Sequence, residues 1–154
     1  METKTETREY YSVDEIREWP MVDGWSVCPE DSSFRASCHR EAQIHASVLI
    51  GRETVVGANA KIRSGAEVEA GATVMDGAII ESGAVVGADA MVDPWALVGA
   101  DAKVEANAVV GTWTVIESGA KVGHRAIIGF GAVVKAGVVV EAGAVIGSGA
   151  RVEA

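Results

Sequence analysis

Three histidines are the residues of this sequence with the widest range of possible chemistry. His39 and His45 are six residues apart, and His124 follows 79 residues after His45. An imidazole acts as a general base or as a metal ligand, and three imidazoles on one zinc ion leave a fourth position open for a reactive water. Whether the three side chains meet depends on the elements that position them.

A six-residue repeat runs through most of the chain. From Ile44 to Val152 every sixth residue is Ile or Val, nineteen times without a break, and the residue two positions earlier is Ala in fifteen cases. Three residues after the Ile or Val, thirteen of eighteen positions hold Gly, Asn or Asp, which tolerate a left-handed backbone conformation. An even period fits strands whose side chains alternate between two faces. The sequence therefore predicts short strands separated by tight corners.

The repeat, written [ILV]-[Gly or charged]-x-x-small-x over residues 34–154, resembles that of the hexapeptide-repeat left-handed parallel β-helix superfamily. The resemblance implies an all-β fold in which three hexads form one triangular coil of 18 residues, with about six to seven coils in total. It also implies homotrimers around a threefold axis. The superfamily includes acyltransferases, γ-class carbonic anhydrases and non-enzymatic scaffolds, so the function has to be argued from sites.

The coil spacing separates the histidines. His124 lies more than four coils beyond His45, which is roughly 20 Å along the prism at about 4.8 Å per coil. In a trimer with parallel axes equal residues share equal heights, so a neighbouring subunit does not bring them together. His39 and His45 remain as candidate ligands of a small-ligand or metal-binding module. The sequence offers no third ligand beside them. We therefore expect no catalytic zinc site.

The resemblance to acyltransferases would make His124, in the corner VGHRAI, the general base. Those enzymes usually carry a loop that interrupts the hexads and helps to enclose acyl-CoA, whereas no loop interrupts the hexads here. Ala106 and Ala142 lie one coil away from His124 on either side, so we expect no carboxylate to orient the imidazole. An exposed corner histidine without a catalytic role is the competing interpretation.

Two of the three outward-facing columns of the prism are apolar, and they meet at one corner. That corner contains Trp95 and Trp113, which are one coil apart and occupy slots that disfavour bulky residues. Exposed apolar area and aromatic anchors are typical of interfaces. We therefore predict a trimer interface formed by Met91, Trp95, Leu97, Val109, Trp113, Val115, Ile127, Phe130 and Val133. The alternative is that the indoles fold back over their own outer face as a local lid.

The first 33 residues lack the repeat, so the sequence predicts an N-terminal arm and cap over 1–33 and the β-helix over 34–154. Ser12 and Glu15 have the capping-box spacing at the start of a short helix, and a short strand is expected over 25–28. Such a cap would cover the first coil, which otherwise exposes its core and its strand edges.

Partner contacts are expected at both ends of the prism. Tyr10 and Tyr11 are left over from the cap, and we predict that they form a partner-binding arm; the alternative is that they extend the cap. No cap is evident after the last hexad, so the final coil is expected to offer an open edge to another protein or to a larger assembly.

Charge and composition exclude several classes of partner. With 22 acidic and 13 basic residues the net charge is −9, which argues against nucleic acid and against anionic membranes. No apolar stretch is long enough to span a bilayer, and no signal peptide is evident. We therefore expect a soluble protein made in the cytoplasm. Cys28 and Cys38 are too few for a disulfide framework, and whether they pair stays open.

Taken together, the sequence favours a non-enzymatic structural or assembly protein that forms a homotrimeric β-helix without a cofactor. Its specific form would be a virion decoration (capsid cement) protein located in the virion, since compact trimers suit the threefold sites of shells. The alternative is an acetyl-CoA-dependent hexapeptide-repeat acyltransferase with His124 as its general base.

Overall fold

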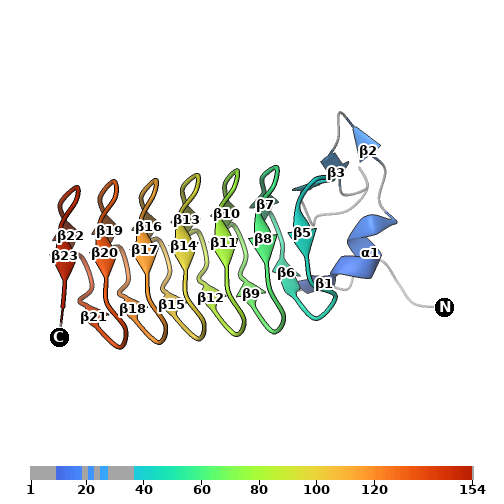
Figure 1. Ribbon diagram of the computed structural model, residues 1–154. Helices are drawn as coiled ribbons and strands as arrows, with labels where there is room; N and C mark the ends of the chain where they lie inside the picture. Colours follow the sequence, from blue (N-terminus) through green and yellow to red (C-terminus); the bar gives the residue numbers. More distant parts are fainter. Residues whose placement is uncertain (1–9, 19–20, 23–24, 28–36, 154) are drawn as a thin grey trace.

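The computed structural model describes residues 10–18, 21–22, 25–27 and 37–153 of the chain. Within them, 23 short strands and one helix are present, and the chain winds into an all-β parallel solenoid of about six coils, which matches a left-handed β-helix (Figure 1). The coil count is at the lower end of the expected six to seven.

Three sheets form the sides of the prism, and each coil adds one strand to each sheet. Sheet A contains β1 (Tyr10–Ser12), β6 (Leu49–Gly51), β9 (Glu67–Val68), β12 (Val85–Val86), β15 (Lys103–Val104), β18 (Lys121–Val122) and β21 (Val139–Val140). Sheet B contains β2 (Met21–Val22), β3 (Trp25–Val27), β4 (Ser37–His39), β7 (Val55–Val56), β10 (Thr73–Val74), β13 (Met91–Val92), β16 (Val109–Val110), β19 (Ile127–Ile128) and β22 (Val145–Ile146). Sheet C contains β5 (Gln43–Ile44), β8 (Lys61–Ile62), β11 (Ile79–Ile80), β14 (Leu97–Val98), β17 (Val115–Ile116), β20 (Val133–Val134) and β23 (Arg151–Val152).

The register of the sheets is one coil of 18 residues. Thr73 pairs with Met91 and Met91 with Val109, always in parallel. The Ile and Val of the repeat point inward and are buried from Ile44 to Val140, and the small residues two positions before them are buried from Val48 to Val138. The six-residue period therefore sets the core, as the sequence predicts.

Three corners join the sheets, and their backbone conformation follows the repeat. The A/B corner comprises residues 51–54, the B/C corner residues 57–60 and the C/A corner residues 45–48. Each corner also includes the residues that follow these at intervals of 18 in the later coils. The third residue of each corner has a positive φ from residue 53 to residue 149. Gly, Asn and Asp adopt this conformation readily, but Trp95 and Trp113 adopt it as well, at φ values of 64° and 61°.

A short N-terminal unit covers the start of the prism. Strand β1 pairs antiparallel with β6, β2 pairs antiparallel with β3, and β3 pairs antiparallel with β4. Helix α1 (Val13–Arg17) begins at the capping box predicted for Ser12 and Glu15, where the Ser12 hydroxyl accepts from the Glu15 N–H at 3.3 Å and the Glu15 carboxylate accepts from the Ser12 N–H at 3.0 Å. The expected strand at 25–28 is β3.

Candidate functional site

The three histidines lie at three different corners of the prism. His39 ends β4 at the B/C corner, His45 follows β5 at the C/A corner, and His124 belongs to the A/B corner. The Nδ1 atoms of His39 and His45 each accept a backbone N–H two residues further on, at 3.1 Å, which is a local turn contact. Among the described residues no group of three or more His, Cys, Asp and Glu side chains has the arrangement of a metal site.

The charge of His124 acts on a carboxylate that the sequence did not indicate. The pKa of the Glu105 carboxyl is lowered mainly by the hydrogen bond from Lys121, whose Nζ lies 2.9 Å from the carboxylate, and the charge of His124 adds a smaller effect in the same direction. Glu105 is therefore held by Lys121, and His124 itself is exposed.

Trp95 and Trp113 form a stack along the B/C corner. Their ring centroids are 5.7 Å apart and their planes differ by 12°. The Trp95 ring also lies against Gly77, one coil earlier, because a Cβ at Gly77 would be only 2.5 Å from Cε3 of the indole. Trp95, Trp113 and Phe130 are still 52%, 56% and 58% exposed. The stack thus packs partly on its own chain and leaves both tryptophans more than half exposed.

The other predicted interface residues flank this stack on sheets B and C. Met91, Val109 and Ile127 point outward from sheet B at successive coils, and Leu97, Val115 and Val133 do so from sheet C. The sequence analysis missed Met75, which is exposed at the same corner one coil before Asp93. Burial raises the pKa of the Asp93 carboxyl above its ordinary value. We call this surface, Met75 with the nine predicted residues, the apolar edge.

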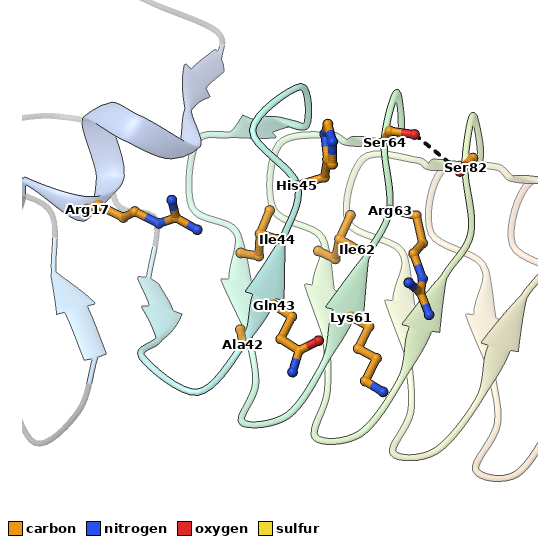
Figure 2. A pocket seen from close by; sticks show the side chains of 10 residues that line it. All are labelled: Arg17, Ala42, Gln43, Ile44, His45, Lys61, Ile62, Arg63, Ser64 and Ser82. Carbon is orange, nitrogen blue, oxygen red and sulfur yellow. Dashed lines mark hydrogen bonds between the residues drawn. The ribbon is translucent and has the colours of Figure 1, made fainter.

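A cavity of about 570 Å³ lies beside the first coils of sheet C, near helix α1. Figure 2 shows Arg17 reaching from α1 toward Ile44, with Lys61 and Arg63 projecting from the next coil. The remaining lining residues are Ala42, Gln43, His45, Ile62, Ser64 and Ser82. The sequence analysis did not identify this cavity, because α1 and sheet C approach each other only in the folded chain.

The remaining predicted residues are the two tyrosines of the arm and the two cysteines. The backbones of Tyr10 and Tyr11 pair with β6 of the same chain, and partner binding by their side chains stays a prediction. Cys38 is a buried free thiol, and burial raises its pKa to about 12. Cys28 lies outside the described residues.

Two sequence profiles of hexapeptide repeats match the chain. The bacterial transferase hexapeptide (six repeats) matches residues 53–88 and 101–136, and the hexapeptide repeat of succinyl-transferase matches residues 77–112. Together they span residues 53–136, which is more than half of the chain. The chain belongs to the hexapeptide-repeat superfamily, as the repeat indicated. A search of curated proteins finds no match.

Solved structures with this fold include acetyltransferases. A hexapeptide transferase family protein from Anaplasma phagocytophilum has a TM-score of 0.64 at 20% identity, over 77% of this chain and 73% of that chain, which shows the fold alone. Mutants of perosamine N-acetyltransferase and of GDP-perosamine N-acetyl transferase from Caulobacter crescentus, both in complex with CoA and GDP-perosamine, have TM-scores of 0.54 at 26% and 27% identity. These alignments cover 79% of this chain but 50% of those chains, so the chain spans half their length.

The described part of the chain has no helix that is long and apolar enough to cross a membrane. Helix α1, with five residues, is the one helix in that part.

Proposed function

We propose that this protein is a non-enzymatic assembly protein that forms a homotrimeric β-helix through its apolar edge. The observation that carries the proposal is the Trp95–Trp113 stack, which is more than half exposed although both residues have an unfavourable positive φ. A non-glycine residue in this conformation costs about 1–2 kcal/mol. That cost calls for a compensating interaction.

Burial of the stack against a second subunit supplies a compensation of sufficient size. An indole that buries about 100 Å² of further apolar surface gains about 2.5 kcal/mol at about 25 cal/mol per Å². This exceeds the backbone cost of each tryptophan. The outward residues on both sides of the stack are apolar for at least three successive coils, so an interface there is continuous along the prism.

The environment of His124 favours assembly over catalysis. A general base is usually oriented by a carboxylate, and the carboxylate of Glu105 is already bonded to Lys121 at 2.9 Å. A place at the threefold site of a larger shell is the specific form of the proposal, because a trimer matches such a site in symmetry. The family matches and the neighbours described above give no support for a virion, so that part stays a prediction.

The experiment compares the molar mass of the wild-type protein in solution with that of a tryptophan variant and of a control variant. We expect the wild-type protein to have three times the monomer mass of 15.9 kDa in light scattering, and Trp95→Gly with Trp113→Asn to be a monomer with an unchanged far-UV circular dichroism spectrum. Both replacements suit a positive φ, so the fold is preserved. Leu49→Thr with Val139→Thr, which removes exposed apolar side chains from sheet A, is the control and should remain trimeric. A monomeric wild type, or a trimeric tryptophan variant, would refute the proposal.

Acetyl transfer is a second candidate, favoured by the similarity to CoA-bound acetyltransferases over 79% of this chain. In that case His124 acts as the general base, next to an interface formed by the outer face of sheet B. Titration with acetyl-CoA tests this candidate. Binding that is lost in His124→Ala supports it, and the absence of binding at millimolar acetyl-CoA discards it.

A further inference from the structure

The cavity beside α1 gathers positive charge in a strongly acidic protein. Its lining includes Arg17 from α1, Lys61 from β8 and Arg63, the residue that follows β8, whereas the whole chain has a net charge of −9. Lys61 and Arg63 flank the buried Ile62, so both side chains project outward, as Figure 2 shows. From this arrangement we propose that the cavity binds a small phosphorylated molecule through these three side chains.

The ion pairs that Arg17 and Arg63 make within the chain are weak. Arg17 is 4.0 Å from Asp14 and Arg63 is 3.9 Å from Glu81, at the outer limit of such contacts, and both arginine side chains are more than half exposed. Exposed pairs of this kind contribute little free energy. Among the described residues, no carboxylate forms an ion pair with Lys61. The guanidinium groups therefore remain able to form paired hydrogen bonds with phosphate oxygens, which suit their planar geometry.

Neutral donors complete the set. The hydroxyls of Ser64 and Ser82 lie 3.3 Å apart at the rim of the cavity, and Gln43 pairs in register with Lys61 on the neighbouring strand. Hydroxyl and amide groups donate to phosphate oxygens without adding charge. The site thus contains charged and neutral donors from α1 and from three successive coils.

The size of the cavity indicates more than a free phosphate ion. A volume of about 570 Å³ is within the range of about 300–1,000 Å³ that is common for small-molecule sites. The cavity is open to solvent, and a phosphate group would fill a small part of its volume, which leaves room for an organic part of the ligand. The acidic remainder of the protein repels anions elsewhere, so binding is localised at the cavity.

The test measures binding of inorganic pyrophosphate and of ADP to the full chain by isothermal titration calorimetry at constant ionic strength. We expect saturable binding of both, with affinity reduced about tenfold in Lys61→Gln with Arg63→Gln. The control is Lys103→Gln with Lys121→Gln, a pair of lysines on adjacent strands of sheet A, which removes the same charge and should change the affinity less than twofold. Arg17→Gln, which leaves the coils untouched, should also weaken binding.

The two ligands distinguish the source of the phosphate. Tighter binding of ADP supports contacts between the organic part and the cavity. Equal affinities support recognition of the phosphate groups and contradict such contacts. The proposal is overturned if neither ligand saturates the protein up to about 10 mM. It is also overturned if the control pair loses as much affinity as the cavity pair, because binding would then follow the overall charge.

Discussion

The contact between Gly77 and Trp95 can be tested by the addition of one methyl group. A Cβ at position 77 would lie 2.5 Å from Cε3 and 2.7 Å from Cδ2 and Cζ3 of the Trp95 ring. Carbon atoms in contact prefer a separation of about 3.5–4.0 Å. In Gly77→Ala the indole must therefore leave its place in the stack.

The magnitude follows from a comparison with Gly131, the equivalent residue three coils later. Both glycines have a positive φ, 72° at Gly77 and 67° at Gly131, so alanine costs about 1–2 kcal/mol at either position. No atom lies within 4 Å of a Cβ at Gly131, whereas the clash at Gly77 adds about 1–3 kcal/mol of overpacking. We expect Gly77→Ala to destabilise the protein by about 2–5 kcal/mol and Gly131→Ala by about 1–2 kcal/mol.

The assay is unfolding in guanidinium chloride, followed by far-UV circular dichroism at one protein concentration because assembly makes stability concentration-dependent. Trp95→Gly should remove the additional loss, so that Gly77→Ala in this background destabilises the protein only as much as Gly131→Ala does. Equal losses for the two alanines in the wild type would refute the stacking geometry. So would a failure of Trp95→Gly to reduce the loss at Gly77.

Two further predictions concern buried groups. Because burial raises the pKa of the Cys38 thiol from 9.0 to about 12, a thiol reagent applied to Cys28→Ser at pH 8 should modify Cys38 only after unfolding. The stabilisation of the fold by the buried, protonated thiol is complete below pH 9 and is lost as the pH rises toward 12. Rapid labelling of Cys38 in the folded protein at pH 8 would contradict the burial of the thiol and the raised pKa that follows from it. The buried Thr54 hydroxyl donates to the Gly51 carbonyl at 2.6 Å, so Thr54→Val should destabilise the protein by about 1 kcal/mol in denaturant unfolding. An unchanged or higher stability would show that this hydrogen bond contributes nothing.

Much of the fold was predictable because one local rule is repeated. An Ile or Val at every sixth position requires an inward-facing side chain at that interval, and the structure buries these residues from Ile44 to Val140. The corner slot was also predictable, even where its residue is unusual. Glu53 and Arg125 have a positive φ although neither is Gly, Asn or Asp, because the repeat sets the corner regardless of the side chain.

The candidate sites were predictable only in part, since they depend on which residues the coils bring together. The 18-residue spacing alone predicts that Trp95 and Trp113 lie one above the other, but it does not indicate that the Trp95 ring rests on Gly77. It also did not indicate that the charge of His124 acts on the Glu105 carboxyl, because the two residues belong to different columns of the prism.

The sequence by itself determined the period of the prism, its buried column and its corners, since each of these follows from the preferences of residues close together in the chain. Only the tertiary structure decided that β1 pairs with β6 and that α1 brings Arg17 to the cavity that Lys61 and Arg63 also line. The physical reason is that these relations join segments outside the repeat, or on different faces, whose approach depends on packing rather than on spacing.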